Sequence, residues 1–370
     1  MPQSKNYAPL PEPLSATQAE EYDPFVRGRF PVGVCSFDVR DKARDRLFPC
    51  EVWYPAAAQH AGQDLAPETQ DTFTARLSGT QQKQTAVRDA AGRPGSYPLI
   101  VFSHHSGGHR RASSFLCTHL SSHGYVVAAL DHSEVIAPEL GRRDGETEEQ
   151  KKTRWQAVIG SRVPDVRFLL DHLLDSGAWN SEAKLDPARI GIVGHSFGAW
   201  TALATPEVDQ RIKAVVTLAP GGTSNPRPGI LPVKLTFQWG RDVPTLYLVA
   251  ENDVPLPLAG MYELFERTIA TKQMIILRRA DHLHFIDNVE QEHEAFRAMP
   301  MPAEVAQMQK EMLPIADLCS GEQAHLWVRG LTLAHMDAAL NRRREAQQLL
   351  ASDIVGELAK RGVAVIAHKS

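Results

Sequence analysis

From residue 98 onward the chain alternates between short apolar runs and longer stretches of helical periodicity. Residues 99–102, 125–130 and 190–193 are apolar runs of strand length. Between them, apolar residues recur three and four positions apart at 113–123 and 163–174, which predicts amphipathic helices. Strands that alternate with helices build a mainly parallel sheet with helices on both faces. The pattern therefore predicts an α/β fold.

Further strands are expected on both sides of this region. Gly33–Arg40 and Arg46–Tyr54 are separated by a polar turn and predict an N-terminal antiparallel hairpin. Three later apolar runs continue the sheet, at 214–218, 245–250 and 274–277, with a helix at 258–269 between the last two. Counted along the chain, this gives eight strands, of which 190–193 is the fifth.

Irregular stretches suggest how the chain is divided. We expect an N-terminal arm, a core and a C-terminal helical extension packed on the core, at residues 1–30, 31–300 and 301–370. Three stretches of the core look like insertions, at 57–97, 134–160 and 220–243. Residues 57–97 have too few large apolar side chains for a second core, and a loop of that length is either functional or partly disordered.

The C-terminal extension carries a helix signal of its own. Ser320 and Gln323 have the spacing of a capping box, and apolar residues follow at helical spacing up to Ala338. This predicts a helix that packs on the sheet, followed by a polar surface segment at 341–348. The alternative use of this helix is a homodimer contact.

Composition narrows the classes of partner. The 370 residues carry a net charge of −4 without a block of basic residues, so neither nucleic acid nor an anionic membrane is an expected partner. We expect no membrane span and no secretory signal, because no apolar stretch reaches the required length. Scattered cysteines without a C-x-x-C pair predict reduced thiols and a cytoplasmic protein (Cys35, Cys50, Cys117 and Cys319).

The segment 194–198 reads Gly-His-Ser-Phe-Gly and follows the predicted strand 190–193 directly. Small and aromatic residues then continue at helical spacing, so the segment has the strand–turn–helix context that a nucleophile elbow requires. Such a turn lifts the Ser196 hydroxyl above the sheet and places it at the positive end of a helix. We therefore predict that Ser196 is a catalytic nucleophile; an ordinary turn is the alternative.

A serine nucleophile needs a base and an acid, which follow it along the chain in this type of fold. Asp253 comes just after the strand 245–250, where catalytic groups of parallel sheets gather. His282 and His284 both follow the strand 274–277. One of them is expected to be the base, and the other to pack or to line the pocket.

The oxyanion of a tetrahedral intermediate needs two N–H donors. One is expected to be the backbone N–H of Phe197, the residue after the nucleophile. The other is expected from the loop after the third strand, where Gly107 and Gly108 let the backbone turn, and we assign it to Ser106. No metal is predicted, since no histidine has a partner at a ligand spacing and a serine mechanism requires none.

The substrate pocket is expected to be mainly apolar. The aromatic candidates to line it are Trp200, near the elbow, and Phe237 and Trp239, in the irregular 220–243 segment. His105, in the loop after the third strand, and His284, in the loop after the last strand, are the other two candidates.

Several of these stretches together resemble the α/β-hydrolases near platelet-activating-factor acetylhydrolase and the dienelactone-hydrolase-like esterases. The resemblance covers most of residues 31–290 and rests on five stretches (31–55, 98–108, 122–132, 194–198 and 280–287). It implies an α/β-hydrolase fold and a serine carboxylesterase that acts on small or short-acyl esters without a cofactor. It also implies that His282, which precedes Phe285 at the family's spacing, is the base.

Three departures from the family narrow what the resemblance implies. Dienelactone hydrolases use cysteine where this chain has Ser196. His104-His105 replaces the usual His-Gly, which narrows the pocket entrance. In the acetylhydrolase the acid follows the strand after the elbow helix, where this chain has Ala219, so the acid is expected one strand later, at Asp253.

Three functions remain open at the level of sequence. Ester hydrolysis through an acyl-enzyme is the leading hypothesis. The same triad would transfer an acyl group to an alcohol or amine if the pocket excluded water, and it would also open a lactone or cleave a polyester fragment. A non-catalytic binding protein of the same fold is the third hypothesis.

Overall fold

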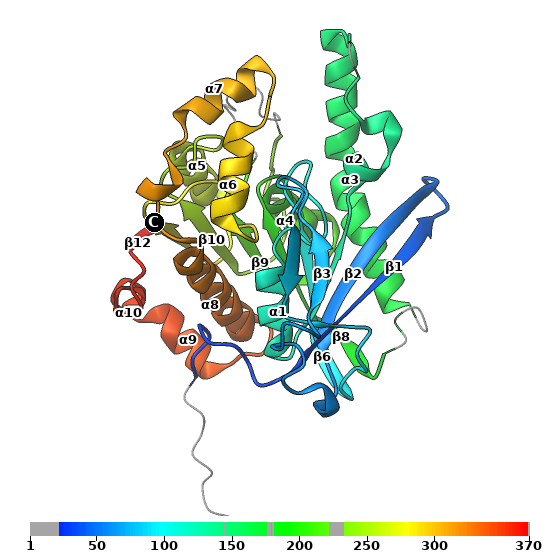
Figure 1. The fold of residues 1–370 in the computed structure, drawn as a ribbon, viewed down its shortest axis with the longest axis vertical. Helices are drawn as coiled ribbons and strands as arrows, with labels where there is room; N and C mark the ends of the chain where they lie inside the picture. Colours follow the sequence, from blue (N-terminus) through cyan, green and yellow to red (C-terminus); the bar gives the residue numbers. More distant parts are fainter. Residues whose placement is uncertain (1–21, 144, 176–178, 180, 222–232, 369–370) are drawn as a thin grey trace, which may run out of the picture.

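The computed structural model describes residues 22–143, 145–175, 179, 181–221 and 233–368. Within them, one sheet of ten strands forms the centre of the molecule (Figure 1). In spatial order the strands are β12 (Val365–His368), β11 (Lys272–Leu277), β10 (Thr245–Ala250), β9 (Ile212–Leu218), β8 (Ala183–His195), β6 (Gly95–Ser103), β7 (Val126–Leu130), β2 (Arg46–Pro55), β1 (Val32–Asp41) and β5 (Val87–Arg88).

The sheet is mainly parallel, as predicted. The six strands from β11 to β7 are paired in parallel. β2 is antiparallel to β7 and to β1, β12 is antiparallel to β11, and the edge strand β5 is parallel to β1. All eight strands expected from the sequence are present, and β8 is the fifth of them. Two short strands, β5 and β12, extend the sheet at its edges and correct the predicted count.

Helices cover both faces of the sheet (Figure 1). α1 (Ser114–Ser122) and α8 (Gly321–Ala339) contact each other on one face, and α3 (Glu148–Leu174) and α4 (Phe197–Val208) contact each other on the other. All residues of β7 and β10 are buried between the two layers. Strands buried on both sides account for the continuous apolar runs in the sequence.

The stretches interpreted as insertions have more structure than the sequence suggested. Residues 57–97 contain a short helix η1 (Ala58–His60), β5 and a two-stranded hairpin of β3 (Asp71–Thr74) and β4 (Gln81–Gln84). Residues 134–160 contain most of α2 (Ser133–Ile136), all of η2 (Pro138–Leu140) and the first half of α3. α3 begins earlier than expected because Thr147 and Gln150 form a capping box.

The second half of the chain completes the layers. α5 (Leu258–Arg267), α6 (Val289–Ala298), α7 (Ala303–Glu311) and η3 (Ile315–Asp317) precede α8, and α9 (Arg344–Ala351) and α10 (Ile354–Lys360) follow it. The Ser320–Gln323 capping box starts α8 as predicted. Residues 341–348 are exposed except for Ala346, as predicted for a surface segment, and α9 begins within them.

The described part of the N-terminal arm is anchored on α8. Phe25 is buried, and its ring lies where a β-carbon on Gly330 would be. The hydroxyl of Tyr22 donates a hydrogen bond to Asp337 at 3.0 Å. The absence of a side chain at Gly330 therefore lets the arm pack closely on the helix.

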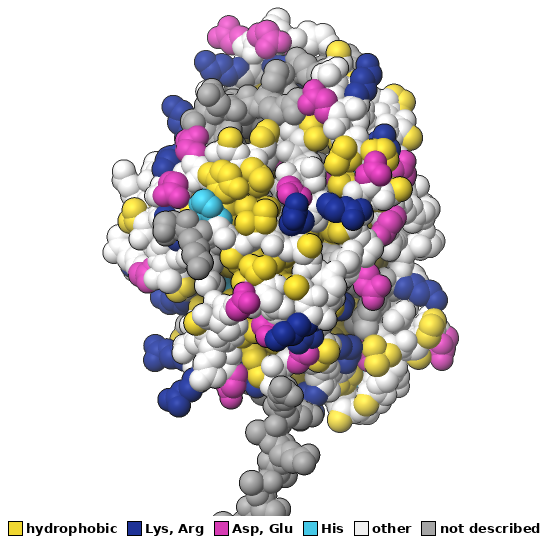
Figure 2. All heavy atoms as spheres, turned by 90° about the vertical axis from the view of Figure 1, so that its left-hand side faces the viewer, with side chains coloured by type: hydrophobic (Ala, Val, Ile, Leu, Met, Phe, Trp, Pro, Cys, Tyr) yellow, Lys and Arg dark blue, Asp and Glu magenta, His cyan; other side chains and the backbone are white. Residues whose placement is uncertain are grey.

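On the face that carries β12, α10 and α7, acidic and basic side chains are interspersed with apolar ones (Figure 2). None of the helices in the described parts of the chain is long and apolar enough to cross a bilayer.

Candidate active site

Ser196 lies between β8 and α4 with a backbone that few residues adopt. Its φ and ψ angles are 57° and −118°, a region that is strained for a residue with a β-carbon. A β-carbon on Gly194 would lie 2.0 Å from the carbonyl oxygen of Gly198, and one on Gly198 would lie 1.9 Å from that of Ser103. The two glycines are therefore required by the tightness of the turn, as expected for a nucleophile elbow.

Three strands bring a serine, a histidine and an aspartate together at their carboxyl ends. The hydroxyl of Ser196, after β8, donates to Nε2 of His282, after β11, at 2.8 Å. Nδ1 of His282 donates to Asp253, after β10, at 2.7 Å. The backbone N–H of Leu256 also donates to Asp253, at 2.8 Å, and fixes the carboxylate.

The environment of the histidine suits a general base. Burial disfavours the imidazolium, but the Asp253 carboxylate outweighs it and raises the pKa of His282 above its ordinary value. Burial in turn raises the pKa of Asp253 against the opposing effect of His282. Glu251, the other carboxylate after β10, accepts instead from the backbone N–H of Arg279.

The expected oxyanion donors come from the start of α4 and from the loop after β6. Phe197 is the first residue of α4, and Ser106 lies in an exposed turn after β6 whose next residue, Gly107, has a φ of 67°. Neither backbone N–H donates a hydrogen bond to another of the described residues. Both groups are therefore available to a ligand.

The chain is similar in sequence to several known proteins. A family model described as "Platelet-activating factor acetylhydrolase, isoform II" matches residues 19–162. The chain is 28% identical over 228 residues to the platelet-activating factor acetylhydrolase of Cavia porcellus, covering 52% of this chain and 48% of the relative. It is 24% identical over 197 residues to cutinase est1 of Thermobifida alba, covering 52% and 55%. The chain thus spans about half the length of these curated relatives.

Among solved structures, a ferulic acid esterase from Streptomyces cinnamoneus aligns with 92% of this chain and 97% of its own, with a TM-score of 0.63 and 24% identity. The chain has the α/β-hydrolase fold. The predicted fold class and the predicted resemblance to the acetylhydrolase group are both confirmed.

The structure places the aromatic pocket candidates in the core. Trp200 stacks on Phe197 at 5.3 Å between ring centroids, and its indole N–H donates to the carbonyl of Lys234. Trp239 donates to the carbonyl of Leu203, and its ring lies 5.8 Å from that of Phe237. All three candidates are at most 6% exposed. Trp200 belongs to α4, and Trp239, with Phe237 beside it, packs against this helix. Of the predicted 220–243 insertion, residues 222–232 lie outside the described part.

His284 has the packing role that the sequence left open beside pocket lining. Its imidazole is buried, donates from Nδ1 to Asp281 at 2.9 Å and from Nε2 to the carbonyl of Cys319 at 3.1 Å. Burial opposes the charged form, but these two acceptors raise the pKa of His284 to about 10. The side chain is therefore part of a packed ion pair and does not line the pocket.

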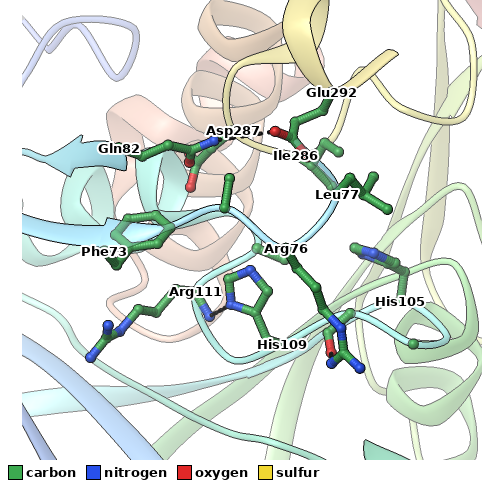
Figure 3. Close-up of a pocket in the computed structure, with 14 residues that line it drawn as sticks. Phe73, Arg76, Leu77, Gln82, His105, His109, Arg111, Ile286, Asp287 and Glu292 are labelled. Atoms are coloured by element: carbon green, nitrogen blue, oxygen red, sulfur yellow. Dashed lines mark hydrogen bonds between the residues drawn. The ribbon is translucent and has the colours of Figure 1, made fainter. Parts of the chain in front are cut away.

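His105 lies at a hollow beside the site (Figure 3). The β3–β4 hairpin contributes Phe73 and Gln82, and Ile286 and Asp287 lie across from it. The His105 ring is 5.3 Å from His195, which in turn is 4.9 Å from His282. Burial and the neighbouring His282 lower the pKa of His105 to about 3, so the ring is neutral.

Two contacts of the site have no counterpart in the sequence interpretation. Nε2 of His195 bonds to the carbonyl oxygen of His282 at 3.0 Å and ties the histidine loop to the elbow. The sequence signal for this contact was the position of His195 directly before the nucleophile, at the variable position of the elbow motif. The second is made by Arg162 of α3, whose guanidinium donates to the carbonyls of His104 and His105 in the loop that carries Ser106.

A second Ser-His-Asp arrangement is buried at the end of β6, next to the loop that carries Ser106. The hydroxyl of Ser103 donates to Nε2 of His132 at 2.8 Å, and Nδ1 of His132 donates to Asp165 at 3.2 Å. All three residues are at most 1% exposed. Among the residues that the structure describes, no group of three or more His, Cys, Asp or Glu side chains could hold a metal.

Proposed function

We propose that this α/β-hydrolase is a serine carboxylesterase that hydrolyses small or short-acyl esters through an acyl-enzyme. The proposal rests on the hydrogen-bonded chain from Ser196 to His282 to Asp253, with distances of 2.8 and 2.7 Å, on a nucleophile elbow. A nucleophile, a base and an acid in these contacts, on a turn that presents the hydroxyl, are the groups that acyl transfer requires.

Each step assigns a task to one of these groups. His282 takes the proton of the Ser196 hydroxyl while the oxygen attacks the ester carbonyl. The backbone N–H groups of Phe197 and Ser106 stabilise the oxyanion that forms. His282 then passes the proton to the departing alcohol, which leaves the acyl group on Ser196. In the deacylation half of the reaction, His282 takes a proton from water and the resulting hydroxide attacks the acyl carbonyl. The acid is released as the bond to Ser196 breaks, and His282 returns the proton to the Ser196 oxygen.

The substrate class follows from the relatives and the neighbourhood of the site. The similar proteins are named as an acetylhydrolase, a cutinase and a ferulic acid esterase, and these names favour an ester as the substrate of this chain. Beside His105 the described residues form a small hollow between the β3–β4 hairpin and residues 286–287. A short acyl group fits such a place better than a long chain does.

A fluorophosphonate probe and a series of p-nitrophenyl esters test this function. The wild-type protein should be labelled and should hydrolyse the acetate and butyrate faster than the decanoate, whereas Ser196→Ala should do neither. A labelled protein whose product, in the presence of an added alcohol, is a new ester without free acid would instead be an acyltransferase. Absence of labelling in the folded wild type would refute the serine mechanism.

A further inference from the structure

Arg162 is a fully buried arginine that contacts the Phe197 ring and the carbonyl of the His105–Ser106 peptide unit. Phe197 and this peptide unit carry the two N–H groups expected to hold the oxyanion. We propose that it is a positioning residue, which fixes the two oxyanion donors in place. The inference rests on the proposed function, because it assumes that an oxyanion forms next to Ser196. It goes further in assigning the geometry of the oxyanion site to a side chain of α3, which touches neither the nucleophile nor the base.

The first contact is with the loop that carries Ser106. One guanidinium nitrogen of Arg162 donates to the carbonyl oxygen of His104 at 2.6 Å, and the other donates to that of His105 at 3.2 Å. The carbonyl of His105 and the N–H of Ser106 belong to the same peptide unit. They point in opposite directions, because peptide bonds in the described chain are trans. This carbonyl also accepts from Nδ1 of His104 at 2.7 Å and from the N–H of Gly108 at 3.0 Å. Arg162 adds the contact from α3, and together these donors direct the Ser106 N–H away from the guanidinium.

The second contact is with the other donor residue. The guanidinium carbon of Arg162 lies 4.3 Å from the centroid of the Phe197 ring, a cation–π distance. Phe197 supplies the other N–H, at the first position of α4. One rigid, planar cation therefore links the Ser106 loop to the start of the elbow helix, two segments about ninety residues apart in the sequence.

The guanidinium of Arg162 is itself fixed by contacts with Glu134 and Ser103. It forms an ion pair with Glu134 of α2, whose side chain is 8% exposed. It also lies 3.4 Å from the hydroxyl of Ser103, which belongs to the buried Ser103–His132–Asp165 group. A buried arginine paired in this way has little freedom to move. Its position is therefore defined before substrate binds, which is the condition for an effective oxyanion site.

A positioning role and a merely structural role predict different kinetics. If Arg162 only stabilised the fold, its loss would lower the melting temperature but leave the kcat of the folded molecules unchanged. If it positions the donors, kcat should fall while KM changes little, because the oxyanion exists only in the transition state. Binding of a boronic acid, which forms a tetrahedral anion on the serine, should weaken in parallel with kcat.

The experiment compares Arg162→Met and Arg162→Lys with a matched control, Arg44→Met. Arg44 forms an ion pair with Asp165, in the same buried group, but does not contact the Ser106 loop. We expect Arg162→Met to lower kcat for p-nitrophenyl acetate about 100-fold, as removal of one oxyanion donor does. Lysine cannot reach both carbonyls, so Arg162→Lys should lose about 10-fold. Arg44→Met should lose stability but keep its kcat within about threefold.

The outcomes separate this inference from the proposed function. If wild type is not labelled by the fluorophosphonate, the proposed function fails, whatever Arg162 does. If wild type is labelled and active while folded Arg162→Met keeps kcat within threefold, the positioning role is refuted and the esterase stands. If Arg162→Met does not fold, the same criterion applies to Arg162→Lys and to Glu134→Gln, which loosens the arginine without removing it.

Discussion

Two Ser-His-Asp groups in this chain have nearly the same hydrogen bonds and different surroundings. In one, Ser196, His282 and Asp253 are joined at 2.8 and 2.7 Å; in the other, Ser103, His132 and Asp165 are joined at 2.8 and 3.2 Å. The His282 side chain is 14% exposed, whereas that of His132 is 1% exposed.

The backbone and the charges differ as well. Ser196 has a positive φ at a tight turn, whereas Ser103 is the last residue of β6. Burial and the nearby Arg162 and Arg44 lower the pKa of His132 well below its ordinary value, in contrast to His282. A triad of side chains is therefore not sufficient for a site. Access to substrate, an elbow and free N–H donors separate the candidate site from the buried group.

The largest expected difference between the two groups is at their serines. Ser196→Ala should lower kcat by about 10⁴-fold or more, since it removes the nucleophile. Ser103→Ala should keep kcat within about threefold and cost about 1–3 kcal/mol of unfolding free energy, because His132 loses a buried partner. Steady-state kinetics and urea unfolding measure the two effects. A Ser196→Ala variant that kept a tenth of wild-type activity would contradict the assignment of Ser196 as the nucleophile.

The aspartates should differ nearly as much. Asp253→Asn should lower kcat by up to ~10⁴-fold with little change in KM, because an amide can favour the wrong histidine tautomer. Asp165→Asn should instead destabilise the fold by roughly 3–5 kcal/mol, since Arg44 loses its buried partner. Glu251→Gln, beside Asp253 in sequence, is the control for kcat. Loss of kcat in Glu251→Gln but not in Asp253→Asn would overturn the assignment of the acid.

The pH profile of kcat/KM should report on His282 alone. A general base works in its neutral form, so activity should rise about tenfold per pH unit below the pKa of His282 and then level off. Because Asp253 raises this pKa, the midpoint should lie above 6.5. His132 should add no second step, since it is neutral in the folded protein. A midpoint below 6 would contradict the charge interaction with Asp253.

His284 should show the smallest effect, on stability rather than on catalysis. His282→Gln should be inactive, whereas His284→Gln should remain active and lose roughly 2 kcal/mol, a typical value for a charged hydrogen bond. The pKa of His284 is raised, so its contribution is complete below pH 6.5 and is lost as pH rises towards 10. Urea unfolding at pH 6 and pH 9.5 should show the gap between variant and wild type shrinking. A constant gap would contradict the ion pair with Asp281.

Edges and insertions were the parts of the fold that periodicity could not predict. β4 reads Gln-Gln-Lys-Gln and has no apolar alternation, so only its pairing with β3 makes it a strand. β12 is likewise short and becomes a strand by pairing with β11. The start of α3 was different, because the Thr147–Gln150 capping box is a local signal that the sequence contained.

The sequence by itself determined the α/β layering, the elbow at Ser196 and the order in which an acid and a histidine follow it. These features depend on local pattern and on the direction of parallel strands, whose ends meet at one edge. Only the tertiary structure decided that His282 faces Ser196 while His284 turns to Asp281, and that the predicted pocket aromatics are buried in the core. It also decided that Arg162 lies under the Ser106 loop. Such contacts join residues far apart in the chain, and their direction depends on how whole elements pack rather than on neighbours in sequence.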